Sequence, residues 1–282
     1  MEERLSLTAD RKESLEKLLQ WHPGFSRRQI SRLKFIPGGL AVNGHPVRAT
    51  DPVLPGDRVS IHLYDCTGPH PESLPYRVLY EDQLLLVVDK PAGLVVHPSP
   101  GHESDSMQTV LESLLHHPLY LKGRLDKDTS GVLVFGKADW VPSLTPVTKR
   151  YLAICEGNPG HRRIDSLLLL RDRKMVPAAS GKSAVTHVVP VKAAGQGRTL
   201  AAVTIEHGRM HQIRAHMASI GHPLLGDCLY GNGREGERTL LHCTAAWITH
   251  PLTKEVLVIT ASLPEDFVRM LAYHPDRNDG SS

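Results

Sequence analysis

One aspartate with a cation on either side is the part of this sequence best suited to chemistry. Asp126 lies between Arg124 and Lys127, and the segment continues through Thr129-Ser130-Gly131 into an apolar strand. A carboxylate that neighbouring cations hold ionised can act as a nucleophile or as a general base. A structural ion pair is, however, the commoner role of a single aspartate. Taken alone, this segment leaves both roles open.

A second cation that could reach Asp126 lies far downstream. We expect a helix to begin at Gly208 or Arg209. The apolar residues of this helix share one face and are Met210, Ile213, Met217 and Ile220. His211 and Arg214 lie off that face and next to each other, because they are three residues apart. Arg214 is therefore a candidate partner for the aspartate.

A metal site is weighed and set aside. His207 and His211 have a spacing that could hold zinc on a helix, but Gly208 lies between them and no glutamate stands where a zinc protease needs one. The four cysteines have no zinc-type spacing and are Cys66, Cys155, Cys228 and Cys243. We expect neither a metal nor a cofactor.

Composition limits the class of protein. The 282 residues suffice for one large domain and a small one, and 40% of them are hydrophobic. A formal charge of +3 permits a nucleic-acid partner without demonstrating one. No apolar run approaches the ~20 residues of a membrane helix, and residues 1–4 do not resemble a signal peptide. We expect a cytoplasmic protein with no membrane partner.

Residues 1–64 are predicted to form a small separate unit. Leucines at 15, 18 and 19 indicate a short helix, and a Ser-x-x-Gln capping box at 26–29 begins a second one. Asn43-Gly44 predicts a hairpin turn, and alternating apolar residues predict a strand near 59–63. Residues 65–75 read as a linker, and the polar tail at 274–282 is expected to be disordered.

This first unit resembles the S4 RNA-binding domain. The resemblance rests on Ser-Arg-Arg-Gln-Ile at 26–30, Val-Asn-Gly at 42–44 and Pro-Gly-Asp at 55–57. It implies that the second helix docks on structured RNA through its basic residues, which are Arg27, Arg28, Arg32 and Lys34. A solvated helix face is the alternative, but the whole order of elements favours RNA binding.

The rest of the chain, 76–273, is mostly strands. We predict strands over 84–88, 94–96, 132–135, 150–155, 184–191, 199–205 and 255–260, and a helix over 107–115. Pro142 and Pro146 argue against a full helix between residues 137 and 149. Many strands with few helices indicate an α+β fold around a mixed or antiparallel sheet.

An ordered set of motifs in this region resembles the RluA family of pseudouridine synthases. The motifs lie at residues 90–97, 123–131, 149–151, 208–216, 221–227, 230–231, 241–242 and 250–251. The resemblance covers about 76–264 and implies the pseudouridine synthase fold. It also implies the isomerisation of uridine to pseudouridine in RNA, in which the C1′–N1 bond breaks and a C1′–C5 bond forms.

The resemblance also assigns roles to residues. Asp126 matches the essential aspartate, either as a nucleophile or as a base that removes a ribose proton, and Arg214 matches the arginine that pairs with it. Tyr151 matches the tyrosine that stacks on the base, and Arg124 matches the arginine thought to help flip the uridine out. Leu241 falls near an apolar pocket position. Three departures are Gly123 in place of histidine, His207 in place of threonine and a short 137–149 segment.

The target RNA is left open. An S4-like unit favours large-subunit ribosomal RNA, while transfer RNA is the alternative substrate, and a monomer is expected. A non-catalytic RNA-binding or ribosome-assembly protein would also have this fold, but Asp126, Tyr151 and Arg214 are all present. A hydrolase acting through Asp126 would need a second carboxylate facing the same bond, and the sequence offers no convincing one.

Overall fold

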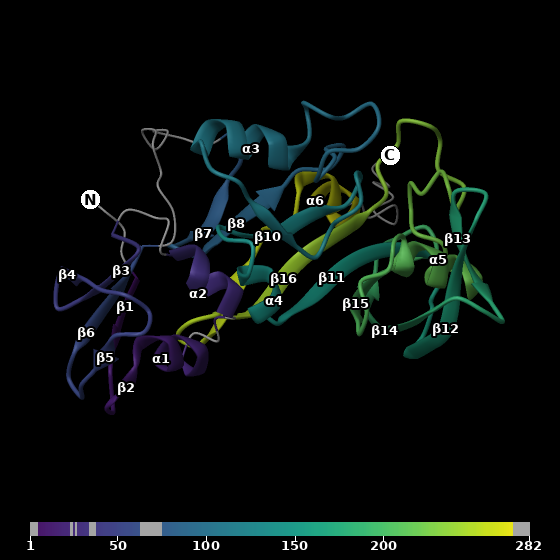
Figure 1. The fold of residues 1–282 in the computed structure, drawn as a ribbon. Coiled ribbons are helices and arrows are strands. Elements are labelled where there is room, and N and C mark those ends of the chain that lie inside the picture. Colours follow the sequence, from purple (N-terminus) through teal and green to yellow (C-terminus); the bar gives the residue numbers. More distant parts are fainter. Residues whose placement is uncertain (1–4, 23–24, 26, 34–37, 63–74, 273–282) are drawn as a thin grey trace, which may run out of the picture.

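A large sheet forms the greater part of the structure (Figure 1). The computed structural model describes residues 5–22, 25, 27–33, 38–62 and 75–272. The strands of this sheet are β7 (Val78–Glu81), β8 (Leu85–Lys90), β9 (Tyr120–Lys122), β10 (Ser130–Gly136), β11 (Val147–Glu156), β12 (Arg162–Arg171), β13 (Lys174–Ala178), β14 (Lys182–Ala193), β15 (Arg198–Ile205), β16 (Leu241–Thr249) and β17 (Val256–Thr260).

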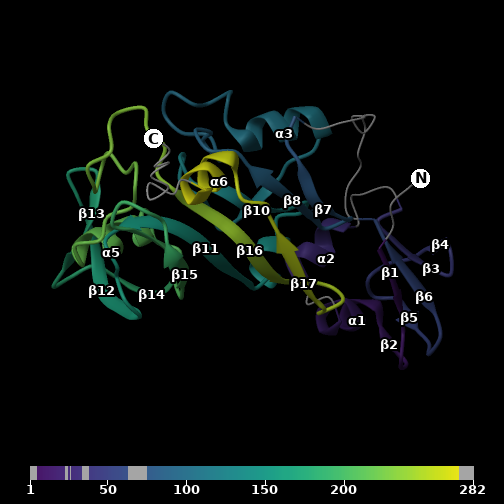
Figure 2. The same ribbon diagram turned by 180° about the vertical axis from the view of Figure 1, so that it is seen from behind.

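The strand order shows that the sheet is mixed. It runs β13-β12-β14-β15-β11-β16-β10-β8-β7, with β9 paired to β10 and β17 paired to β16. Figure 2 shows β17 beside β16 from behind. Only β10 and β16 pair in parallel, and the other recorded pairs of this sheet are antiparallel. The predicted α+β class with a mixed sheet is confirmed.

The backbones of the parallel strands β10 and β16 approach closely at the centre of the sheet. Every residue of β10 is buried. Gly131 of β10 has φ +107° and lies directly against the backbone of Cys243 in β16, where a Cβ atom would collide with the Cys243 carbonyl. Glycine is required here for both reasons. The Thr-Ser-Gly turn therefore delivers the chain from the Asp126 loop straight into the core.

Four helices pack on this sheet within the described part of the chain after residue 75: α3 (Met107–Leu115), α4 (Val141–Leu144), α5 (Gln212–Ser219) and α6 (Glu265–Ala272). The predicted helix over 107–115 is confirmed, and the short α4 agrees with the limit set by Pro142 and Pro146. Among the described helices none is long and apolar enough to cross a membrane.

The chain before residue 63 folds around a second, smaller sheet. Its strands β1 (Leu5–Thr8), β6 (Arg58–Ile61), β3 (Leu40–Val42) and β4 (His45–Pro46) pair in that order, and β2 (Glu13–Ser14) pairs with β5 (Pro52–Val53). The helices are α1 (Leu15–Trp21), with its three leucines buried as predicted, and α2 (Arg27–Leu33). The hairpin at Asn43-Gly44 is also confirmed. The capping serine Ser26, residues 65–74 of the linker and the tail lie outside the described residues.

The small unit contacts the rest of the protein at the start of α4 through a pair of aromatic rings. The ring of Phe25 meets Trp140 edge to face, with 4.5 Å between centroids. Both residues are buried and belong to one continuous hydrophobic core. Edge-to-face pairs add about 0.5–1.5 kcal/mol beyond area burial. The boundary at residue 64 stays a prediction, because the core extends across it.

Two predicted elements are wrong. Residues 94–96 form no strand, because the carbonyls of Val95 and Val96 instead accept hydrogen bonds from the first amides of α3. The helix expected from Gly208 or Arg209 begins only at Gln212. His211 has a left-handed φ of 50°, and the amide of Arg209 donates to the Gln212 side chain at 3.0 Å, so this segment is a turn.

Candidate active site

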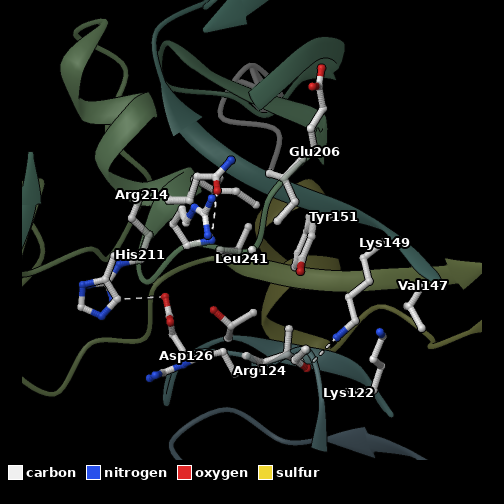
Figure 3. Close-up of a pocket in the computed structure, with 18 residues that line it drawn as sticks. Lys122, Arg124, Asp126, Val147, Lys149, Tyr151, Glu206, His211, Arg214 and Leu241 are labelled. Carbon is white, nitrogen blue, oxygen red and sulfur yellow. Dashed lines mark hydrogen bonds and ion pairs between the residues drawn. The ribbon is translucent and has the colours of Figure 1, made fainter. Parts of the chain in front are cut away.

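The five residues predicted for the active site line one cavity of about 180 Å³ (Figure 3). Asp126 and Arg124 come from the loop between β9 and β10, and Arg214 comes from α5. Tyr151 lies on β11 and Leu241 begins β16. Strand pairing explains the convergence, because β16 lies between β11 and the end of the loop at β10.

The loop that carries Asp126 is held by hydrogen bonds to two successive backbone carbonyls, those of Asp126 and Lys127. The amide of Thr129 donates to the Asp126 carbonyl at 3.1 Å. The next carbonyl, that of Lys127, accepts from the Gly93 amide at 2.9 Å and from Lys90 Nζ at 2.8 Å. Lys90 is fully buried, and burial lowers the pKa of this amine to about 7. The Lys90–Gly93 turn therefore fixes the backbone while the Asp126 side chain faces the cavity.

Arg214 interacts with two carboxylates, Asp227 and Asp126, and its hydrogen bonds to Asp227 are the shorter ones. Nε and Nη2 of Arg214 donate to the two oxygens of Asp227 at 2.7 and 2.8 Å, whereas Nη1 lies 3.8 Å from Oδ2 of Asp126. The predicted pairing with Asp126 is present only as this long ion pair. A paired fork of this kind fixes the plane of the guanidinium. Asp227 is thus the hydrogen-bond anchor, and Arg214 presents its remaining nitrogen to Asp126.

The surroundings of Asp227 favour its charged form. Burial alone would raise the pKa of this carboxyl, but the hydrogen bonds and charge of Arg214 outweigh burial and lower it. The amides of Leu229 and Tyr230 add two hydrogen bonds of 3.0 Å to Oδ1. The Tyr230 ring lies under the Arg214 guanidinium at 5.3 Å. Arg214 is consequently packed as well as paired.

Tyr151 is buried at the wall of the cavity. Its ring is 5% exposed, and burial, followed by the nearby Cys243 and Asp126, raises the pKa of the hydroxyl well above its ordinary value. The hydroxyl is therefore protonated at neutral pH. This geometry suits stacking on a base and makes Tyr151 a poorer proton acceptor than an ordinary tyrosine.

The last two predicted residues lie in different surroundings. Leu241 is 3% exposed and presents an apolar surface to the cavity. Arg124 is exposed and also lines the cavity. A long exposed cation beside a pocket can reach a phosphate of the RNA or fill the space that a base leaves in an RNA helix. Both are consistent with the implied role of Arg124 in flipping the uridine out.

Four further histidines form hydrogen bonds or ion pairs within the fold. His216 contacts Ser166 and Thr186, His222 contacts the Glu156 carbonyl, His242 contacts Ser130, and His250 pairs with Asp82. Over the described ranges, no group of three or more His, Cys, Asp or Glu side chains could hold a metal ion. Each of these four side chains therefore has a partner within the fold.

Sequence reasoning assigned no role to four other charged residues of the cavity wall. These are Lys122, Lys149, Glu206 and Arg209. Glu206 pairs with His187 at 2.9 Å, and Lys122 donates to the Pro142 carbonyl at 2.6 Å. Lys149 could have been found from its spacing, because it precedes Tyr151 by two residues on one strand and so shares its face.

The basic residues predicted to bind RNA are described only in part. Arg27 is exposed at the start of α2, and its Nε lies 3.5 Å from Glu16. Arg28 and Arg32 belong to the same helix, but their side chains lie outside the described part of the structure, as does Lys34 entirely. The RNA-binding role of this helix stays a prediction.

With the fold and the cavity described, comparison with known proteins identifies the class. The family model for RNA pseudouridylate synthases matches residues 84–219. An uncharacterized RNA pseudouridine synthase, YlyB of Bacillus subtilis, is 35% identical over 95% of this chain and 97% of its own length. The chain is an RNA pseudouridine synthase and belongs to the RluA family of these enzymes.

Two further comparisons agree. A protein of Zymomonas mobilis named ribosomal large subunit pseudouridine synthase D is 32% identical over 86% of this chain and 87% of its own length. The solved structure of the human RNA pseudouridylate synthase domain containing 4 covers 69% of this chain and 91% of its own, with a TM-score of 0.54 and 24% identity. The latter likeness concerns the fold alone. The expected pseudouridine synthase fold is confirmed.

Proposed function

We propose that Asp126 is the essential group of this pseudouridine synthase. The observation that carries the proposal is the convergence of Asp126, Arg214 and Tyr151 on one cavity, with Arg214 held by Asp227. The reaction exchanges a C1′–N1 bond for a C1′–C5 bond and moves one proton from C5 to N1, so it is neutral in redox terms. Asp126 would either bond to C1′ or remove a ribose proton.

The other cavity residues have supporting roles in this proposal. Tyr151 and Leu241 hold the uracil ring between an aromatic and an aliphatic surface. Arg124 occupies the place that the uridine leaves when it is turned out of the RNA, since a stacked base cannot reach a pocket. A hydrolytic alternative lacks a partner, because Asp227 is fully buried behind Arg214 and Glu206 is paired with His187.

Large-subunit ribosomal RNA is the proposed substrate. The support is the printed name of several relatives, among them that of Zymomonas mobilis. The test is tritium release from [5-³H]uridine in ribosomal and transfer RNA, each transcribed without modifications. Release from ribosomal RNA alone would support the proposal, and release from transfer RNA alone would replace it. The monomeric state and the cytoplasmic location stay predictions from the sequence.

The helix α2 supplies a separate prediction about RNA binding. We expect Arg27→Glu with Arg28→Glu to weaken binding to large structured RNA by about tenfold at low salt, because two phosphate contacts become repulsive. The slope of log affinity against log salt should become shallower by about 2. Filter binding across salt concentrations measures both quantities.

The matched control changes the same charge elsewhere on the small unit. Arg11→Glu with Lys12→Glu alters two exposed cations that precede β2. This control should bind RNA more nearly like the wild type. Equal losses of RNA affinity in the two double variants would refute a specific role for α2. The net charge of the small unit would then explain the binding.

A further inference from the structure

Lys149 is a buried cation with very little to compensate its charge. The residue is 8% exposed, and its Nζ donates to the Gly123 carbonyl at 3.2 Å. Burial lowers the pKa of the Lys149 amine. Among the described residues, the only other titratable group that acts on it is Cys243, whose thiol is neutral because burial raises its pKa to about 11. Within the described chain, no carboxylate forms an ion pair with this ammonium.

The other two buried lysines of the described chain have more partners than Lys149. Lys137 Nζ pairs with Glu81 at 2.8 Å. Lys90 donates to two backbone carbonyls and has the charges of Asp128 and Asp126 nearby, although burial still lowers the pKa of its amine to about 7. Burying an ammonium is costly unless charge or several hydrogen bonds offset the lost hydration. Lys149 therefore weakens the fold, and this indicates that the position serves the reaction.

The ammonium of Lys149 faces the substrate cavity. Lys149 and Tyr151 are two residues apart on β11, so both side chains leave the strand on the same face, roughly 7 Å apart. Figure 3 shows Lys149 beside Tyr151, on the side away from Asp126. A uracil stacked on Tyr151 with its ribose at Asp126 would place the far edge of the base next to Nζ.

Gly123 keeps the approach to Nζ open. A Cβ atom at this position would lie 3.7 Å from Lys149 Nζ and 4.0 Å from its Cε, so a larger side chain would extend over the ammonium. Gly123 also has φ +73°, which suits glycine. The glycine that departs from the family pattern is therefore the residue that leaves the cation accessible from the cavity.

We propose that Lys149 Nζ donates a hydrogen bond to a carbonyl oxygen of the target uracil and stabilises negative charge on the departing base. This proposal rests on the function proposed above. When the C1′–N1 bond breaks, its electron pair leaves with N1 and spreads onto O2 and O4. The C1′–C5 bond then forms as Asp126 either leaves C1′ or returns the ribose proton. The C5 proton passes to solvent, and N1 takes up a proton from solvent. A fixed cation in a dry pocket stabilises such charge far better than water-exposed cations do.

The test compares Lys149→Met with the wild type under single-turnover conditions. Methionine keeps the shape of the chain and removes the charge. We expect the rate to fall by about 100-fold, the RNA dissociation constant to change little, and the melting temperature to rise because an uncompensated buried charge is gone. Lys149→Arg, which keeps the charge, should retain more of the rate.

Lys137→Met is the matched control, since it removes a buried lysine that is paired. Its melting temperature should fall, because Glu81 loses this partner, while its turnover stays at the wild-type level. Wild-type turnover of uridine RNA reads out the proposed function by itself. A failure of that function is therefore distinguishable from a failure of the Lys149 proposal.

A second substrate separates charge stabilisation from mere positioning. Fluorine at C5 withdraws electrons and makes the uracil a better leaving group. Loss of 5-fluorouridine from the RNA, followed by mass spectrometry of nuclease digests, should therefore show a deficit for Lys149→Met at least about tenfold smaller than on uridine. An equal deficit on both substrates, or wild-type rates for Lys149→Met, would overturn the proposal.

Discussion

Asp126→Asn should reduce tritium release from [5-³H]uridine RNA to background, a loss of about 1,000-fold or more. An amide has the size of a carboxylate but neither attacks C1′ nor accepts a ribose proton at neutral pH. The loss should lie in the rate of a single turnover. The dissociation constant for RNA should stay close to that of the wild type, because exposed cations carry most of the phosphate contacts.

The structure explains why this variant should fold. The backbone bond from Thr129 to the Asp126 carbonyl does not involve the side chain, and Arg214 keeps its two short bonds to Asp227. Asp128→Asn in the same turn is the matched control, since Asp128 does not line the cavity. Full turnover by Asp126→Asn, or an equal loss in Asp128→Asn, would remove Asp126 from the essential position.

Much of the fold could be predicted because local patterns determined it. Alternation along β6, the Asn43-Gly44 turn and the apolar spacing in α3 are each a short-range signal. Strand β12 was not predicted because its run of leucines at 167–170 has no period of two. Strand β13 was not predicted because it is short and contains Pro177, which is tolerated there because β13 lies at the edge of the sheet. The segment of β16 was predicted only as a motif. Their positions in the sheet depend on distant partners rather than on their own residues.

The same distinction between short-range signals and distant partners applies to the candidate site. The five pocket residues were found from motif order, and the structure brings them together. The predicted pair of Arg214 with Asp126 is present, but its shorter bonds to Asp227 were not predicted, because helix spacing does not say which carboxylate a loop after the helix brings to the arginine. The sequence also could not show that Lys149 lacks an acidic partner. Only the folded structure shows that, among the described residues, no carboxylate lies close enough to act on its amine.

Asp227→Asn should cost both stability and turnover, although Asp227 does not line the cavity. The substitution leaves Arg214 buried, with only the long pair to Asp126. Breaking a buried pair from one side typically lowers the free energy of unfolding by about 3–5 kcal/mol. Urea unfolding followed by tryptophan fluorescence measures this loss. Turnover should fall because Arg214 is no longer fixed beside Asp126.

The pH dependence of stability distinguishes this ion pair from simple packing. The pKa of Asp227 is lowered in the folded protein from an ordinary value of 3.8, so its stabilising effect is complete above about pH 4 and disappears as the pH falls further. The difference in unfolding free energy between wild type and Asp227→Asn should therefore shrink below pH 4. A difference that is constant with pH would show that the charge of Asp227 is not what stabilises the fold.

A double variant then separates the structural role of the pair from its role in the reaction. In Arg214→Met with Asp227→Leu, neither charge is left unpaired, so much of the lost stability should return. Turnover should not return, because Arg214, the cation that lies 3.8 Å from the Asp126 carboxylate, is gone. Recovery of both properties would mean that the pair only supports the fold. Recovery of stability alone would mean that the reaction needs the Arg214–Asp227 pair itself and not only the stability that it gives the fold.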